Sequence, residues 1–141
     1  MRISDILRVK GSDVVTTPAN TTVRELIATL VENRIGAVIV VDGPRVLGVV
    51  SERYVVHSLH ELGDGVLAAE VSQLMTSDVI SCTPGDDIDT IAETRTEKRI
   101  RHMPVMSADR LVGVVSIGDV VKSRIAQLET ETGQLAHYIT G

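Results

Sequence analysis

Two serines in this chain stand where an apolar stretch gives way to a predicted helix. Ser116 is followed three residues later by Asp119, and Ser51 is followed at the same spacing by Tyr54. The first turn of a helix presents free backbone N–H groups and the positive end of the helix dipole, so a serine there can help to hold a phosphate. A carboxylate almost one turn further on can accept two hydrogen bonds from a vicinal diol such as that of a ribose. The Asp119 copy is therefore a candidate binding site for a phosphorylated sugar.

The same two residues also have a structural alternative. A serine followed three positions later by an acidic residue forms a capping box, in which each side chain bonds the backbone N–H of the other residue. The two roles can coexist, because a ligand can displace the cap. Tyr54, in the other copy, can give one hydrogen bond but cannot accept a diol as a carboxylate does.

A basic cluster, Lys98–His102, lies in this acidic chain and can offset the charge of a phosphate. Its last two residues, Arg101 and His102, are adjacent in a predicted strand, so their side chains alternate to opposite faces. Both can face one cleft only if the end of the strand bends. Taken alone, a histidine in an apolar strand is more often structural than a ligand contact.

The composition narrows the classes of function. A chain of 141 residues predicts one domain, and a net charge of −5 with no Trp, no Phe and two Tyr argues against a nucleic-acid surface. The one cysteine, Cys82, cannot close an internal disulfide and is expected in the core of a protein from a reducing compartment. The chain shows no signal core and no apolar run near the ~20 residues of a membrane span. His57 and His60 lack a third ligand, so no metal is expected. These observations predict a soluble, cytoplasmic protein.

Two segments of the chain repeat one another. Val14–Val56 and Val79–Val121 share a Thr-Pro pair, an Arg-Ile pair and a Gly-Val-Val-Ser stretch in the same order. Two copies are too few for a solenoid, which needs at least three stacked units. The repetition predicts an α/β fold in which a pseudo-symmetric pair of repeats shares one core.

Each copy predicts the order strand, helix, strand, strand, helix. The strands end at Thr-Pro, the helices open at capping residues, and turn residues separate the two strands of each hairpin. The expected elements are the strands Val14–Thr17 and Val79–Cys82, the helices opening at Thr22 and Asp87, the hairpins Ala37–Val50 and Met103–Val115, and the helices beginning near Ser51 and Ser116.

The linker between the repeats and the C-terminal segment are expected to be helical. The expected division is 1–62 for the first repeat with its lead-in, 63–76 for a linker helix over Val66–Met75, 77–124 for the second repeat, and 125–141 for a C-terminal helical extension. Apolar residues follow a heptad-like spacing from Val121 to Ile139, interrupted by Thr132. This seam can lie on the chain's own surface or pair with a second subunit.

The duplicated order, the stretches "RIGAVIVVD" and "RIRHMPVMS", and the stretches "GVVSERYVV" and "GVVSIGDVV" resemble a tandem pair of cystathionine-β-synthase (CBS) domains, a Bateman module. The resemblance covers nearly the whole chain. It implies two repeats that pack sheet-to-sheet about a pseudo-twofold axis and leave two clefts between them. In that family the clefts commonly hold AMP, ADP or ATP, and sometimes S-adenosylmethionine or NAD.

The resemblance also implies contacts in one of the clefts. Ser116 and Asp119 would lie beside the ribose, and Arg101 and His102 would lie on the phosphate side. The adenine wall would come from the first repeat, at Ile35–Ala37. This is the cleft expected to bind.

The other cleft would use Ser51 and Tyr54. There the family's ribose-binding aspartate is absent, and Glu52 adds a negative charge near the phosphate end, so this cleft is expected to bind weakly or to stay empty. The complete set of binding candidates is Ile35, Gly36, Ala37, Arg101, His102, Met103, Pro104, Ser116 and Asp119, with Ser51 and Tyr54 in the weaker cleft.

By this resemblance the chain is expected to be a non-catalytic, regulatory module that binds an adenosine-type ligand and signals to another protein. A homodimer is expected, with no nucleic-acid or membrane partner. The alternatives are a ligand-free dimeric interaction scaffold and, less favoured, a binder of S-adenosylmethionine or NAD.

Overall fold

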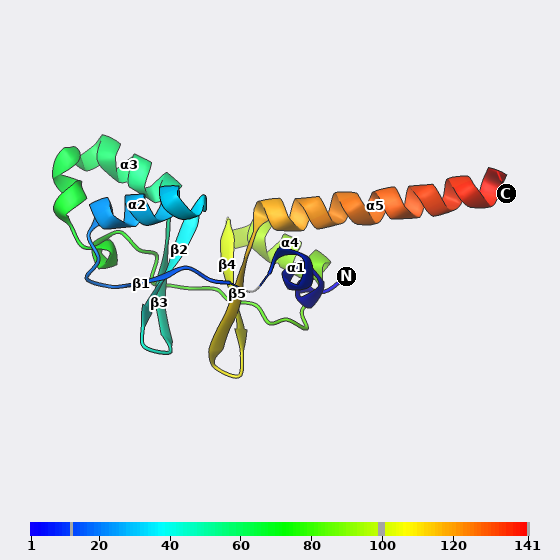
Figure 1. The fold of residues 1–141 in the computed structure, drawn as a ribbon, viewed down its shortest axis with the longest axis horizontal. Coiled ribbons are helices and arrows are strands. Elements are labelled where there is room, and N and C mark those ends of the chain that lie inside the picture. Colours follow the sequence, from blue (N-terminus) through cyan, green and yellow to red (C-terminus); the bar gives the residue numbers. More distant parts are fainter. Residues whose placement is uncertain (12, 99–100, 141) are drawn as a thin grey trace.

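The computed structural model describes residues 1–11, 13–98 and 101–140, and the side chains of these residues except 95–98 and 132–140. Figure 1 shows two small sheets side by side in the middle of the molecule, with helices on their outer sides and one long helix that extends away from the body. The elements are α1 (Ile3–Lys10), β1 (Thr16–Pro18), α2 (Val23–Asn33), β2 (Ala37–Asp42), β3 (Arg45–Ser51), α3 (Glu52–Leu62), the 3-10 turns η1 (Asp64–Ala68) and η2 (Val71–Gln73), α4 (Ile88–Lys98), β4 (His102–Ser107), β5 (Arg110–Ser116) and α5 (Ile117–Thr140).

The first repeat has the predicted order. Strand β1 pairs in parallel with β2, and β2 pairs antiparallel with β3. Helix α2 begins at the predicted N-cap, because Thr22 Oγ1 accepts a hydrogen bond from the Glu25 N–H at 3.2 Å. The Glu25 carboxylate accepts from the Thr22 hydroxyl at 2.9 Å, which is not the backbone bond of a complete capping box. The apolar face of this helix is buried on the sheet. The predicted α/β class and the pair of repeats are confirmed.

The second repeat lacks the predicted first strand at Val79–Cys82. Only Cys82 pairs there, as an isolated parallel bridge with Val105. The next hydrogen bond of such a ladder would run from residue 104 to the carbonyl of Ile80, and Pro104 has no N–H to donate. In the first repeat the equivalent donor is present, since the Ile39 N–H bonds the Val15 carbonyl at 3.4 Å. One proline thus shortens the second sheet to two strands, β4 and β5.

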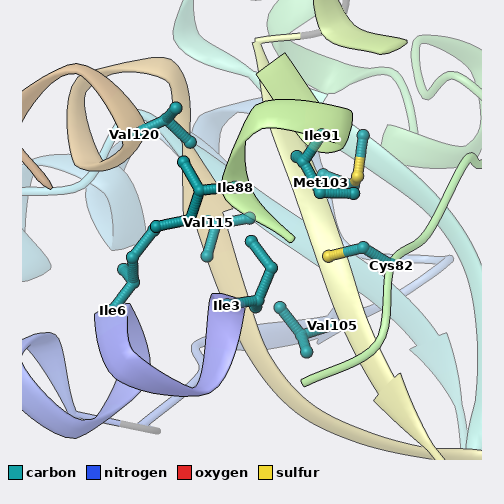
Figure 2. Close-up of a cluster of buried hydrophobic side chains, with 9 residues drawn as sticks. All are labelled: Ile3, Ile6, Cys82, Ile88, Ile91, Met103, Val105, Val115 and Val120. Atoms are coloured by element: carbon teal, nitrogen blue, oxygen red, sulfur yellow. The ribbon is translucent and has the colours of Figure 1, made fainter. Parts of the chain in front are cut away.

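The buried side chains form two clusters, one for each repeat, in place of the single shared core that was expected. Each cluster also takes side chains from the segment that precedes the other repeat. Ile3 and Ile6 of α1, an element that the sequence did not predict, pack into the second cluster (Figure 2). Val71 lies in the first cluster and Val66 is also buried, and they belong to two 3-10 turns where one linker helix was expected. The exchange ties the repeats together.

The single cysteine lies in the second cluster (Figure 2), as predicted, and Cys82 is 3% exposed. Burial, with a contribution from the negative charge of Asp86, raises the pKa of this thiol to about 12. The thiol is therefore neutral at physiological pH, which argues against a nucleophilic role.

The C-terminal extension is helical and is continuous with the last helix of the second repeat. Both belong to α5, of 24 residues. Its seam residues Val121, Ile125 and Leu128 are about half exposed, at 50%, 51% and 56%. The side chains of Thr132 and Ile139 lie outside those that the structure describes.

Candidate ligand-binding clefts

A cleft of about 570 Å³ opens between the two repeats. Its volume lies within the range of about 300–1,000 Å³ that is typical of small-molecule sites. Both repeats and the linker between them contribute to its wall. The lining residues are Val49, Ser51, Arg53, Tyr54 and His57 from β3 and α3, Thr76 from the end of the linker, Asp78, Val79 and Ile80 from the beginning of the second repeat, and Arg101, His102 and Pro104 at the start of β4. We call this the open cleft.

The first turn of α3 forms one side of the open cleft. Ser51 is the N-cap of this helix, and its hydroxyl accepts a hydrogen bond from the Tyr54 N–H at 3.3 Å. Tyr54 and His57, one turn apart, lie on the same helix face and both line the cleft. A helix start of this kind favours an anionic ligand group.

The start of β4 forms the opposite side and adds positive charge. Arg101 and Arg53 line the cleft from different repeats, and guanidinium groups are always charged in proteins. Asp78 is the one carboxylate among the lining residues of this described part of the chain. The balance of formal charge in the open cleft is therefore positive.

His102 reaches toward the first repeat. A Cβ atom added at Gly36 would lie 3.5 Å from His102 Nε2 and 3.6 Å from Glu52 Oε1. A methyl group at position 36 would therefore be in ordinary van der Waals contact with the imidazole. This contact brings together two of the predicted site residues from opposite repeats.

Asp119 lies outside the lining of the open cleft and is bound within its own surroundings. The predicted capping box is present, since the Ser116 N–H donates to Asp119 Oδ2 at 2.8 Å and the Asp119 N–H donates to Ser116 Oγ at 3.2 Å. In addition, Lys10 Nζ donates to Asp119 Oδ2 at 2.6 Å and to the Val114 carbonyl at 2.8 Å. The carboxylate therefore already has a cationic partner.

The structure groups the predicted site residues differently from the expectation. Arg101, His102 and Pro104 line the open cleft together with Ser51 and Tyr54. His102 and Ser116 are neighbours within one sheet. The side chains at the start of β4, however, point across the interface and meet the first repeat, where Ser51 and Tyr54 lie. The sequence does not show which of the two a side chain will meet.

Three further predicted site residues do not line the open cleft. Met103 is fully buried in the second core cluster, because it alternates with His102 to the opposite face of β4. Ile35 packs against the first core cluster, and Ala37 pairs with Ser51 across the β2–β3 ladder. Met103 is thus a core residue and not a cleft residue.

The two repeats present different side chains at matched positions. Strands β2 and β4 hold matched places in the two repeats. The carbonyl of the residue just before each strand accepts a hydrogen bond from the first N–H of α3 or α5, and the residue after it pairs with the serine that caps that helix. The matched pairs are Glu52 N–H to Gly36 O and Ile117 N–H to Arg101 O, both at 2.9 Å, with strand partners Ala37–Ser51 and His102–Ser116. Gly36–Ala37 therefore occupy in the first repeat the positions that Arg101–His102 occupy in the second.

Sequence reasoning missed several lining residues. Arg53 and His57 could have been found from the helical spacing around Tyr54, because a helix start that lines a cleft presents its first two turns to it. Thr76, Asp78 and Lys10 lie in lead-in segments whose conformation had no clear sequence pattern. Within the described residues, no group of three or more His, Cys, Asp or Glu side chains is arranged to hold a metal ion, and no helix there is long and apolar enough to cross a membrane.

Asp119→Asn is expected to lower the free energy of unfolding at neutral pH by about 1 kcal/mol, because the amide loses the charge that faces Lys10 and the helix dipole. Burial raises the pKa of Asp119, but hydrogen bonds from Lys10 and Ser116 and the charge of Lys10 outweigh it and bring the pKa below its ordinary value of 3.8. A carboxyl group with a lowered pKa in the folded state adds stability that is complete above the unfolded value and is lost as the pH falls through the folded value.

The difference in stability between Asp119→Asn and the parent protein should therefore be constant near pH 7 and should shrink below about pH 4. Urea unfolding at several pH values measures it. An undiminished difference at the lowest pH would show that the charge of Asp119 does not contribute.

The fold and the open cleft define a class of protein, the two-repeat α/β modules with a ligand-sized cleft between the repeats. The chain belongs to the CBS-domain family, whose model matches residues 3–61 and 71–126. A CBS-domain-containing protein of Agrobacterium tumefaciens has a similar structure, with 40% identity, a TM-score of 0.85 and coverage of 88% of this chain and 99% of that one. A CBS domain protein of Pyrobaculum aerophilum, solved in complex with AMP, is 29% identical with a TM-score of 0.79, and the match covers 94% of this chain and 99% of that one.

A longer relative shares only part of its length with this chain. An uncharacterized 33.4 kDa protein of Thermofilum pendens is 40% identical over 99 residues, which are 70% of this chain and 32% of that protein. The chain thus spans about a third of that relative.

Proposed function

We propose that this chain is a regulatory module that binds an adenosine nucleotide between its two CBS repeats. The observation that carries the proposal is the open cleft, whose volume suits a small molecule and whose lining joins two arginines to the start of a helix. A related protein of the same fold, 29% identical, has been solved with AMP. A negatively charged phosphate would be attracted to Arg53 and Arg101.

The open cleft is the proposed binding site for this nucleotide. A phosphate there would lie near Arg101 and His102, and the apolar side chains of Val49, Val79 and Ile80 would offer surface for the adenine ring. Position 54 supplies no diol acceptor, but Asp78 lines the same cleft and is proposed to accept from the ribose. A ligand beside Asp119, as predicted from the sequence, would have to share that carboxylate with Lys10, whose ammonium bonds Oδ2.

The proposed role is regulatory and not catalytic. The lining combines residues of both repeats, so a bound nucleotide would favour one relative arrangement of the repeats over others. Such a preference couples ligand binding to whatever protein contacts the module. A second copy of the chain is proposed to pack on the half-exposed seam of α5, at Val121, Ile125 and Leu128.

Calorimetric titration with AMP, ADP, ATP, S-adenosylmethionine and NAD tests the proposal, with light scattering on the same samples to test for a dimer. One site per chain is expected for at least one phosphorylated adenosine compound, and saturation at 100 times Kd should stabilise the fold by about 2.7 kcal/mol. If none of the five compounds gives heat or a shift in thermal unfolding, the ligand-free scaffold is the better interpretation.

A further inference from the structure

Lys10, the last residue of α1, reaches the start of α5 from the other end of the chain. Its ammonium lies 2.6 Å from Asp119 Oδ2 and 2.8 Å from the Val114 carbonyl oxygen. The side chains of Lys10 and Asp119 are 39% and 22% exposed, so the pair is partly shielded from water. Lys10 therefore binds both the end of β5 and the first turn of α5.

The matched place in the first repeat has a different donor. There the Val49 carbonyl accepts a backbone hydrogen bond from the Thr76 N–H at 3.0 Å, and both residues line the open cleft. In the second repeat the equivalent carbonyl, that of Val114, accepts from the Lys10 side chain. A backbone donor leaves the space beside the helix start free, whereas the lysine side chain fills it.

The ammonium competes directly with a ribose. Like a pair of diol hydroxyls, it is a hydrogen-bond donor to a carboxylate. Asp119 Oδ2 already accepts from the Ser116 N–H and from Lys10, at 2.8 and 2.6 Å. A diol that bonds both carboxylate oxygens, one hydroxyl to each, needs Oδ2 and therefore competes with Lys10 for it. Removing the lysine charge from a partly buried carboxylate has a free-energy cost.

We propose that Lys10 is a specificity-determining residue that limits the module to one ligand, because its ammonium occupies Asp119 and keeps adenosine-type compounds out of the second cleft. The inference rests on the proposed function of the open cleft. The second cleft is the place beside Asp119 that matches the open cleft by pseudo-symmetry, and it has Gly36 and Ala37 where the open cleft has Arg101 and His102. It therefore lacks the arginine that suits a phosphate, and the compound that it would accept after loss of Lys10 is an adenosine without phosphate.

Calorimetry with adenosine and with AMP on the full chain tests this inference. The variants are Lys10→Met and Lys10→Gln, each also combined with Asp119→Asn, and Arg8→Met serves as the matched control because Arg8 is an exposed cation on the same helix. In both Lys10 variants adenosine is expected to bind about tenfold or more tightly than in the parent protein. This adenosine site should be separate from the AMP site, so it should remain when AMP is already bound. The Asp119→Asn change should remove that second site, and Arg8→Met should behave as the parent protein.

The outcomes separate the two proposals. If the parent chain binds one AMP and the Lys10 variants gain no adenosine site, Lys10 does not control the second cleft, and the proposed function stands. If the parent binds nothing while the Lys10 variants bind adenosine, the role of Lys10 stands and the open cleft is not a nucleotide site. If no protein in the series binds either compound, the role proposed for Lys10 is wrong and AMP is not the nucleotide of the open cleft. Thermal unfolding of each variant shows whether it is folded.

Discussion

Arg101→Ala is expected to weaken AMP binding by about 10- to 100-fold, the effect of losing a charged hydrogen-bond donor to a phosphate. Arg101 lines the open cleft from the second repeat, opposite the start of α3. Its guanidinium can bind two phosphate oxygens at once, which an ammonium cannot match in geometry. Arg101→Lys should therefore recover only part of the affinity. Calorimetric titration of AMP measures both variants.

The matched control for this change is Arg110→Ala. Arg110 is an exposed arginine at the start of β5, next to the hairpin turn and outside the lining of the open cleft. It removes the same charge from the same repeat without touching the proposed site. If both alanine variants weaken AMP binding equally, the effect is one of overall charge, and Arg101 has no direct contact with the phosphate.

Gly48→Ala is expected to lower the free energy of unfolding by about 2–3 kcal/mol, at the upper end of the cost of overpacking. A methyl group at this position would lie 2.7 Å from Met75 Sδ and 2.8 Å from the Thr76 carbonyl oxygen. The side chain of Met75 can move, but the Thr76 carbonyl belongs to backbone that is hydrogen-bonded to Val49. The linker would have to shift away from β3.

The pseudo-symmetry supplies the control for Gly48→Ala. At the matched Gly113, a methyl group would lie 2.6 Å from Leu7 Cδ2, and its three nearest atoms all belong to that flexible, partly exposed side chain. Gly113→Ala should therefore cost clearly less, about 1 kcal/mol. Urea unfolding of the two variants gives the comparison. Equal losses would mean that the linker backbone yields as easily as the leucine side chain.

The open cleft should respond to the same substitution. Thr76, Asp78 and Ile80 line it, and the shift that Gly48→Ala demands begins at Thr76. The position of this linker relative to β3 determines how much space the cleft offers. Gly48 thus links the packing of the linker on β3 to the dimensions of the proposed site.

Much of the fold follows from local sequence signals. The Thr22 cap of α2, the two hairpins and the serine caps before α3 and α5 all lie where the residue pattern predicts them. Such features depend on residues within a few positions of one another, so a single sequence contains the information. The same holds for the repetition, which alone implies the pseudo-symmetric pair.

The elements that sequence reasoning missed depend on distant contacts. Helix α1 is short, and its buried residues Ile3 and Ile6 find their partners only in the second repeat. The shortened second sheet depends on the missing N–H of Pro104 opposite Ile80. In both cases the decisive partner lies far away in the chain.

The candidate site was predictable in its parts and not in its grouping. Ser51, Tyr54, Arg101 and His102 were all identified from the sequence, yet they come together in one cleft, while Asp119 binds Lys10. Which repeat supplies which wall depends on how the two sheets face one another. No local pattern encodes that relation.

A crystal structure of the parent protein grown with AMP is the most direct test of the proposed function. The prediction is one nucleotide per chain in the open cleft, with its phosphate beside Arg101 and with Lys10 still bound to Asp119. A nucleotide whose ribose binds Asp119, with Lys10 displaced and the open cleft vacant, would contradict both the proposed binding site and the role of Lys10.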